Sequence, residues 1–293
     1  MPRVSVVLPC YNGARFLRAS LDSVLAQTFP DWELIIVDDC STDGSGEIAD
    51  EYATRDARIR VVHNSVNRKL PGALNDGFAI ARGAYFTWTS DDNVAKPNWL
   101  STLVQYLDNH PGTDMVSACM DFINEDGNTI GKLHRSPDVE YQSRLAYECN
   151  IGAAFMYRRE TAARVGKYDE NMFCAEDYDY WVRIGLGGKI DYICDNIYMY
   201  RRNSGSLTAT QQERIWAKTL AIKKKYKDQW LQKLGLNWWQ RKKLEYLVRN
   251  PYCKSEFSIC GAIHTLGRQF ANTVFFWSPN MRHRLKNKLK IQL

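Results

Sequence analysis

The chain has 293 residues, of which 45% are hydrophobic and 25% charged, a composition typical of a soluble globular protein. No stretch approaches the roughly 20 uncharged apolar residues that a membrane-spanning helix needs. The first apolar run, residues 4–8, is too short for a signal peptide, so we expect a cytosolic protein. The eight cysteines contain no CxxC pair, which argues against a zinc site or a disulfide scaffold and favours buried, reduced thiols.

The charge is distributed unevenly along the chain. Residues 1–209 carry a net charge of −8, whereas residues 210–293 carry +14, with 18 Lys and Arg against 4 Asp and Glu. We therefore predict a domain over residues 1–209 and a basic extension over residues 210–293. A basic segment attached to an acidic body favours an anionic partner.

Strands and helices are predicted to alternate from the N-terminus onward. Residues 4–8, VSVVL, predict a buried strand. Asn12 is the candidate N-cap of an amphipathic helix that ends at Pro30, and residues 33–39, ELIIVDD, predict a second buried strand. Strand, helix and strand in this order form a βαβ unit, which predicts a parallel sheet with a right-handed crossover.

The same alternation continues to the end of the predicted domain. Further strands are predicted at residues 59–63, 84–89, 114–122, 153–157, 189–194 and 197–201. Further helices are predicted to end near Ala53 and to span residues 71–81, 97–109, 160–165 and 176–186. Asp126-Gly127 is typical of a hairpin turn. Together these elements predict an α/β fold with a mostly parallel, Rossmann-like sheet flanked by helices.

Polar residues follow three of the predicted strands, at residues 9–12 (PCYN), 38–39 (DD) and 90–93 (SDDN). In parallel α/β sheets, ligands bind at the carboxyl ends of the strands, where the strand order reverses. An aromatic side chain and carboxylates around one site suit a nucleotide. The alternative is ordinary loop polarity, with Ser41 or Asp43 capping the next helix.

Two groups of carboxylates are candidates for chemistry. Asp91 and Asp92 are adjacent like charges, and Mg²⁺ or Mn²⁺ would offset their repulsion; the alternative is that Asp92 caps a helix. Glu176, Asp177 and Asp179 open a predicted helix, where acidic side chains favour the positive end of the helix dipole. Three acids in four residues exceed what capping needs, and Asp177 is the candidate general base.

Several common active-site motifs are absent from the sequence. No GxGxxG follows the first strand, and there is no GxxxxGK[ST], HExxH or GxSxG. Their absence weakens the case for a dinucleotide-binding protein, a P-loop nucleotidase, a zinc protease or an α/β-hydrolase.

Four segments, in this order, resemble the GT-A-fold glycosyltransferases of family two. They begin VSVVLPCYNG, ARGAYFTWTSDDN, GKYDENMFCAEDYDYW and YRRNSGSLT, and they span residues 4–45, 81–93, 166–184 and 200–208. The resemblance implies an inverting enzyme that uses a nucleotide sugar, expected to be UDP-linked. It would transfer one sugar to a saccharide or lipid-linked acceptor in the synthesis of an envelope or surface polysaccharide.

The resemblance also implies roles for individual residues. The residues implied in nucleotide binding are Pro9, Tyr11, Asn12, Asp38, Asp39, Lys69 and Asp91. Asp92, with Asp91, would ligate Mn²⁺ or Mg²⁺. Asp177 would be the catalytic base, and Glu176 and Trp181 would lie near the acceptor. Arg201 and Asn203 would lie near the diphosphate.

The chain departs from the family pattern at three places. The family often has His where Asn203 stands, and Arg where Leu74 stands; Lys69 or Arg68 could supply the latter charge. The QxxRW signature of processive synthases is also absent, because Ile215 follows Arg214 in QQERIW, which favours transfer of a single sugar. A GDP- or dTDP-sugar donor, or a catalytically inactive relative that binds nucleotide sugars or membranes, remain as alternatives.

The basic extension is predicted to be helical, and tryptophans lie among its charges. One interpretation is that it packs against the domain. Another is that it docks on an anionic membrane surface, because Lys and Arg attract headgroups and Trp suits the interface. The two are compatible. Nucleic-acid binding is not expected, since no recognition motif supports it.

Overall fold

The computed structural model describes residues 1–135, 141–235, 241–242 and 244. Most of the predicted extension beyond residue 235, including the final basic sequence RHRLKNKLK, lies outside the described residues. Within the described part, no helix is both long enough and apolar enough to cross a membrane.

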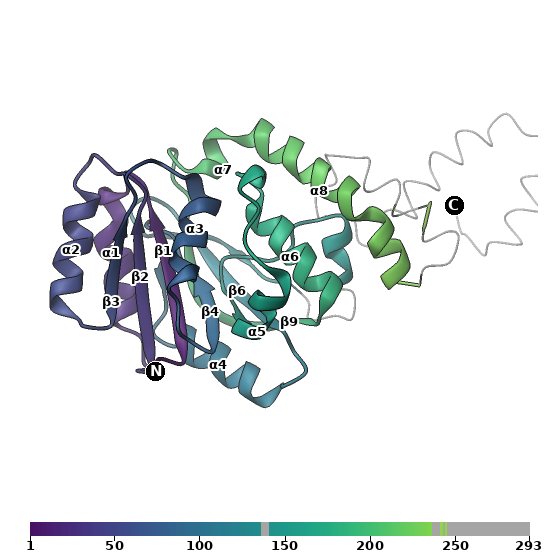
Figure 1. The fold of residues 1–293 in the computed structure, drawn as a ribbon, viewed down its shortest axis with the longest axis horizontal. Helices are drawn as coiled ribbons and strands as arrows, with labels where there is room; N and C mark the ends of the chain where they lie inside the picture. Colours follow the sequence, from purple (N-terminus) through teal and green to yellow (C-terminus); the bar gives the residue numbers. More distant parts are fainter. Residues whose placement is uncertain (136–140, 236–240, 243, 245–293) are drawn as a thin grey trace, which may run out of the picture. The chain divides into compact units, whose positions relative to one another are not determined.

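The described residues form a nine-stranded sheet with helices on both faces (Figure 1). Its strands are β1 (Val4–Cys10), β2 (Trp32–Asp38), β3 (Ile59–His63), β4 (Tyr85–Trp88), β5 (Val94–Ala95), β6 (Met115–Ile123), β7 (Thr129–Leu133), β8 (Phe155–Arg158) and β9 (Ile190–Arg201). The α-helices are α1 (Ala14–Leu25), α2 (Ser45–Arg55), α3 (Lys69–Ala79), α4 (Trp99–Asn109), α5 (Arg159–Val165), α6 (Glu176–Gly187), α7 (Leu207–Thr210) and α8 (Gln212–Lys233).

The sheet is mostly parallel, which confirms the predicted fold class. Its strand order is β3-β2-β1-β4-β8-β6-β9-β5, and β7 pairs with β6. The pairs β1–β2, β2–β3, β1–β4 and β6–β9 are parallel, whereas β8 is antiparallel to both of its neighbours. The chain runs outward from β1 to β3 and then returns to place β4 on the other side of β1. The strand order therefore reverses between β1 and β4, the position where parallel sheets bind ligands.

The alternation of side chains along the strands builds a core on each face of the sheet. Val6 and Leu8 of β1 pack in a cluster with Leu17 of α1 and residues of α4. Val7, which points the other way, packs in a second cluster with Leu74 of α3 and residues of α6 and α8. Two apolar layers therefore fix β1 at the centre of the sheet, with its carboxyl end directed to the site described below.

The structure corrects two local predictions and adds one element. Asn12 does not cap α1: it has a φ of 53°, the helix begins at Ala14, and the N–H of Ala14 donates to Oδ2 of Asp43 at 3.0 Å. A residue 29 positions along the chain thus caps the helix, because the β2–α2 loop lies beside it. Residues 189–194 and 197–201 form one strand, β9, whose register against β6 shifts between Ala118 and Cys119. The short strand β5 was not predicted.

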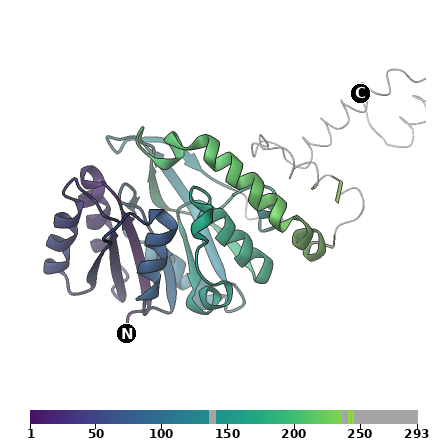
Figure 2. The same ribbon diagram turned by 45° about the horizontal axis from the view of Figure 1, so that its top comes forward.

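Helix α8, the first part of the predicted extension, packs on the domain. Ile222, Tyr226 and Trp230 are buried in the cluster that includes α6, and α8 runs alongside α6 (Figures 1 and 2). Packing against the domain is therefore confirmed for this helix, while the boundary between residues 209 and 210 stays a prediction.

The prediction of buried, reduced cysteines holds only in part. The six cysteines within the described residues are free thiols. Cys10 and Cys119 are buried, but Cys194 is exposed, because it lies where the β9 register shifts.

Candidate active site

Asp91 lies directly against the end of β1. A Cβ atom added to Gly13 would meet Oδ2 of Asp91 well inside 3.0 Å, so only glycine leaves room for this carboxylate. Burial and the adjacent charge of Asp92 raise the pKa of Asp91 to about 7, although hydrogen bonds from the Cys10 thiol and the Tyr11 backbone oppose the shift. The predicted convergence of the first and fourth strand ends therefore occurs, at the point where the strand order reverses. Sequence reasoning gave no role to Cys10 or Gly13.

Asp92 is held from three directions rather than capping a helix. Ser90 Oγ donates to its Oδ1 at 2.6 Å, and Asn203 Nδ2 donates to its Oδ2 at 2.7 Å. The guanidinium of Arg201 donates to its backbone carbonyl at 2.8 Å. Burial raises the pKa of Asp92, while the hydrogen bonds from Ser90 and Asn203 and the charge of Arg201 oppose the shift. Two neighbouring carboxylates with raised pKa values would be stabilised in their charged form by a cation.

Arg201 donates hydrogen bonds from its guanidinium to backbone carbonyls. It is 5% exposed, and its Nη1 donates to the carbonyls of Asn124 and Glu125 at 2.9 and 2.8 Å. Its guanidinium also lies 4.6 Å from the centre of the Phe16 ring. These contacts make Arg201 a structural support for the backbone at Asp92, and its predicted position near a diphosphate stays a prediction.

The nucleotide-binding candidates gather at the ends of β1 and β2. Tyr11 is 53% exposed, as an aromatic ring that stacks on a ligand must be. Asn12 Oδ1 accepts from the N–H of Thr42, which fixes the loop beside it. Pro9, in contrast, is buried within β1 opposite Val37.

Asp38 and Asp39 are both oriented by neighbouring groups. Asp38 accepts from the N–H of Ser41 and lies 3.0 Å from His63 Nδ1. Burial opposes ionisation of Asp38, but the bonds to Ser41 and His63 outweigh it and lower its pKa. Asp39 Oδ1 accepts from Asn64 Nδ2 and from the N–H of Arg68, both at 2.9 Å. These bonds fix the two carboxylates before any ligand arrives.

Arg68 and Lys69, at the start of α3, differ in whether their positive charge is already paired. Arg68 forms ion pairs with Asp76 and Glu170, whereas Lys69 is exposed at the first position of the helix. Leu74 is fully buried in the core. Lys69 is therefore the better placed of the two to meet an anionic ligand.

The acidic group at the start of α6 divides into two parts. Glu176 accepts from the N–H of Cys174, and Asp177 accepts from the N–H of Tyr178. Burial raises the pKa of both carboxyls, and the charge of Asp177 adds to the shift of Glu176. Asp179 instead is fully buried, pairs with Arg183 and accepts a hydrogen bond from Tyr226 of α8.

Tyr200 is influenced electrostatically by residues of both acidic groups. Burial raises its pKa, and the charges of Asp92 and Asp177 add to the shift, although a hydrogen bond with Thr208 opposes it. The hydroxyl lies 3.3 Å from Thr208 Oγ1. Asp92 and Asp177 therefore both disfavour ionisation of Tyr200. Sequence reasoning missed this residue, although it opens the quoted segment YRRNSGSLT.

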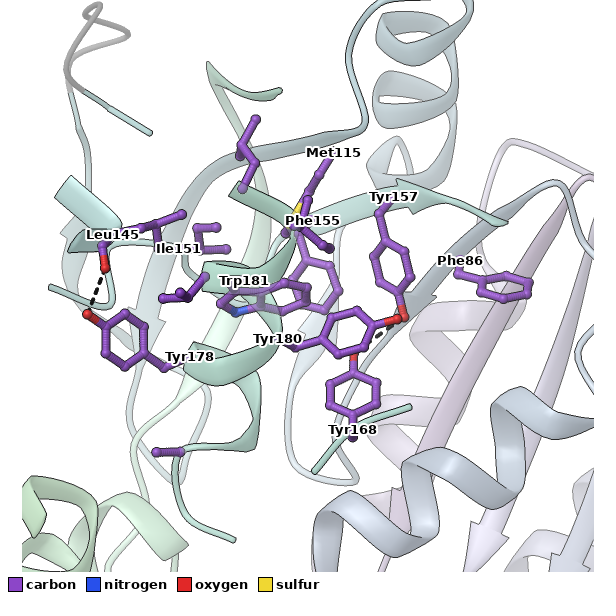
Figure 3. Close-up of a cluster of buried hydrophobic side chains, with 14 of the residues drawn as sticks. Phe86, Met115, Leu145, Ile151, Phe155, Tyr157, Tyr168, Tyr178, Tyr180 and Trp181 are labelled. Atoms are coloured by element: carbon purple, nitrogen blue, oxygen red, sulfur yellow. Dashed lines mark hydrogen bonds between the residues drawn. The ribbon is translucent and has the colours of Figure 1, made fainter. Parts of the chain in front are cut away.

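Trp181 lies in the core rather than in an open site. Its indole is 1% exposed and packs edge-on against Phe155, with ring centres 4.6 Å apart (Figure 3). Tyr180 and Tyr157 lie beside it in the same aromatic cluster. In this conformation Trp181 presents almost no surface to an acceptor, because α6 directs it inward.

Several known proteins are similar in sequence to this chain. It is 30% identical over 233 residues to the glycosyltransferase GlyG of Streptococcus pneumoniae, covering 74% of this chain and 76% of that protein. It is 29% identical over 307 residues to the uncharacterized glycosyltransferase EpsJ of Bacillus subtilis, covering 99% and 83%. A 33% match to the uncharacterized protein y4gI of Sinorhizobium fredii covers 74% of this chain but only 24% of that longer protein.

The fold and a family model agree with these similarities. The crystal structure of S. aureus TarS residues 1–349 matches with a TM-score of 0.65 at 20% identity, covering 87% of this chain and 73% of that one. The same protein in complex with UDP matches with a TM-score of 0.64 at 19% identity, covering 90% and 74%. The model for glycosyl transferase family 2 matches residues 5–166, more than half of the chain. The chain therefore belongs to glycosyl transferase family 2.

Proposed function

We propose that the chain is an inverting glycosyltransferase that moves one sugar from a UDP-sugar to a hydroxyl group of a saccharide or lipid-linked acceptor. The observation that carries the proposal is the acidic pair at the point where the strand order reverses, with Asp91 against Gly13 and Asp92 held by Ser90 and Asn203. The UDP and UDP-GlcNAc complexes of TarS support a uridine nucleotide as the donor. Such a transfer would serve the synthesis of an envelope or surface polysaccharide.

The residues present suit a divalent metal ion. Asp91 and Asp92 offer hard carboxylate oxygens, and burial and mutual repulsion make a cation beside them favourable. Within the described residues, no three His, Cys, Asp or Glu side chains are grouped so as to hold a metal. The protein would therefore supply one or two carboxylates and leave the other positions to diphosphate and water, as Mg²⁺ prefers. When bound, Mg²⁺ or Mn²⁺ supplies a positive charge that stabilises the departing diphosphate.

The chain's own residues would carry the remaining steps. Tyr11 would stack on the base, Asp39 would accept a hydrogen bond from it, and Lys69 would lie near the diphosphate. Asp177 would accept the proton of the acceptor hydroxyl as the acceptor oxygen attacks the anomeric carbon and the bond to the diphosphate breaks. Because burial raises its pKa, Asp177 is a stronger base than an exposed aspartate.

The location of the enzyme belongs to the same proposal. We place it in the cytoplasm, with the basic residues beyond α8 bound to an anionic membrane surface. Residues 236–293 contain 11 Lys and Arg against 2 Glu, a charge that suits anionic headgroups. A lipid-linked acceptor would lie at such a surface.

A thermal-shift series tests the donor and the metal together. UDP with Mn²⁺ is expected to raise the melting temperature more than UDP alone, since a ligand that binds only the folded state stabilises it. GDP and dTDP, each with Mn²⁺, test the alternative donors. Stabilisation by none of the three nucleotides would contradict the proposal, and binding of UDP without any sugar transfer from a panel of UDP-sugars would favour an inactive relative.

A further inference from the structure

We propose that Glu125, in the turn between β6 and β7, is a positioning residue for the donor site. It anchors the segment 203–206 so that Asn203 meets the carboxylate of Asp92. The inference rests on the proposed function, since it gives that site a support to which no role has been assigned. Glu125 itself does not touch Asp91, Asp92 or Asp177 in any contact of the described residues, so it acts through the segment.

The first observation is the bridge that the Glu125 carboxylate forms. Its Oε1 accepts from both the N–H and the Oγ of Ser204, each at 3.2 Å. Its Oε2 lies 2.7 Å from Nη1 of Arg15, at the start of α1. One side chain thus ties the segment to a helix on a different part of the chain, and charged hydrogen bonds of this kind are stronger than neutral ones.

The second observation is that the same turn also supports Arg201. The carbonyls of Asn124 and Glu125 accept from the guanidinium of Arg201, whose Nε donates to the carbonyl of Asp92. The turn therefore holds Arg201 through its backbone and Ser204 through a side chain. Asn203 lies between these two anchored residues.

The third observation is the local structure of the segment. Ser206 Oγ donates to the carbonyl of Asn203 at 3.0 Å, and the side chain of Ser206 accepts from the N–H of Ala209 at the start of α7. These bonds shape the turn but connect it only to itself and to α7. The bonds to Glu125 connect it to the body of the domain at Ser204, next to the residue that binds Asp92.

The expected consequence is a penalty in metal and donor binding when the anchor is removed. Without Glu125, Asn203 would have to be ordered each time the site binds its ligand. Partners outside the immediate ligands of a metal commonly change its affinity by about 10-fold to 100-fold. Because Glu125 acts only through the segment that holds Asn203, we expect the dissociation constant to rise by about 10-fold, at the lower end of this range.

The test compares Glu125→Ala with Glu125→Gln and with a control, Glu51→Ala. Gln keeps an oxygen that can accept from Ser204 but loses the charge that pairs with Arg15, so it is expected to recover part of the binding. Glu51 also pairs with an arginine of α1, since its Oε2 lies 2.6 Å from Arg18 Nη2, but it does not touch the segment. The Glu51→Ala control therefore measures the effect of losing a surface ion pair with α1 and nothing else at the segment.

Two measurements decide the outcome. In the protein without ligands, hydrogen exchange of the peptide that spans residues 200–206 should speed up in Glu125→Ala and not in Glu51→Ala. Calorimetric titration with UDP and Mn²⁺ should show a dissociation constant about 10-fold higher in Glu125→Ala. Unchanged exchange, or an unchanged dissociation constant alongside a lowered melting temperature, would overturn the inference. If the wild-type protein bound no UDP with Mn²⁺, the proposed function would fail, and wild-type exchange rates in Glu125→Ala would refute the anchor separately.

Discussion

Asn203 donates a hydrogen bond from Nδ2 to Oδ2 of Asp92 at 2.7 Å, across 111 positions of sequence. The contact joins the end of β9 to the loop that follows β4, and Ser90 binds the other oxygen of the same carboxylate. Asp92 is thereby fixed in one orientation before a donor binds. Where the family often has histidine, this chain has an amide that positions the acidic pair.

Replacing Asp92 by Asn is expected to reduce metal-dependent transfer by about 100-fold or more, the loss typical of removing one group that stabilises charge in a transition state. The amide cannot supply the negative charge that attracts the cation. Initial rates measured over a range of Mn²⁺ concentrations check this. Asp31→Asn, an exposed residue before β2 at the opposite edge of the sheet, is the matched control. Full activity of Asp92→Asn would refute the metal assignment.

Asp177→Asn is expected to reduce the rate of sugar transfer by about 100-fold or more, while UDP binding stays near the wild-type level. The reason is that the base acts on the acceptor rather than on the nucleotide. If UDP binding is lost together with transfer, Asp177 belongs to the donor site and the base lies elsewhere. Calorimetry with UDP and Mn²⁺ alongside transfer rates separates the two cases.

The pH dependence of kcat/KM tests the same residue in the wild-type enzyme. Only deprotonated Asp177 can accept a proton, and burial raises its pKa. The rate should therefore fall as the pH is lowered through that raised pKa, at a higher pH than the ordinary aspartate value of about 3.9 would give. A rate that stays constant down to about pH 4 would contradict the assignment.

Gly13→Ala is expected to weaken UDP binding and to lower stability by about 1–3 kcal/mol, the usual cost of forcing extra atoms into a packed site. The new methyl group would overlap the carboxylate of Asp91. Gly112→Ala is the control, because a Cβ there meets no atom within 4 Å. Urea unfolding and UDP titration of both variants give the comparison, and equal behaviour of the two would show that Asp91 can move aside.

Tyr226→Phe is expected to destabilise the protein by about 1.5–3 kcal/mol, the range for hydrogen bonds to charged groups. Its hydroxyl donates at 2.9 Å to Asp179, a fully buried carboxylate that also binds Arg183 and Lys225. Lys227→Ala, which removes the pair between a half-buried lysine and the exposed Asp228, should change stability by less than about 1 kcal/mol. Urea unfolding measures both, and a neutral Tyr226→Phe would show that this hydroxyl does not help to hold α8 on the domain.

The sequence predicted most elements of the fold because they depend on local patterns. Runs such as VSVVL and ELIIVDD are dominated by apolar, β-branched residues, as buried parallel strands require, and amphipathic spacing marked α1. The failures involve partners distant in sequence. Asp43, rather than Asn12, binds the first N–H of α1, because the loops after β1 and β2 lie side by side there. A local sequence pattern does not show which loops are neighbours in space.

The residue types alone determined the family pattern and the candidate carboxylates Asp91, Asp92 and Asp177. Only the tertiary structure decided how they are used. It set Asp91 against Gly13, fixed Asp92 through Asn203 and assigned Arg201 to backbone carbonyls. It also turned Trp181 into the core and Asp179 toward α8. The physical reason is that a side chain's role depends on which distant groups desolvate it and donate to it, and packing between elements, rather than local sequence, brings those groups together.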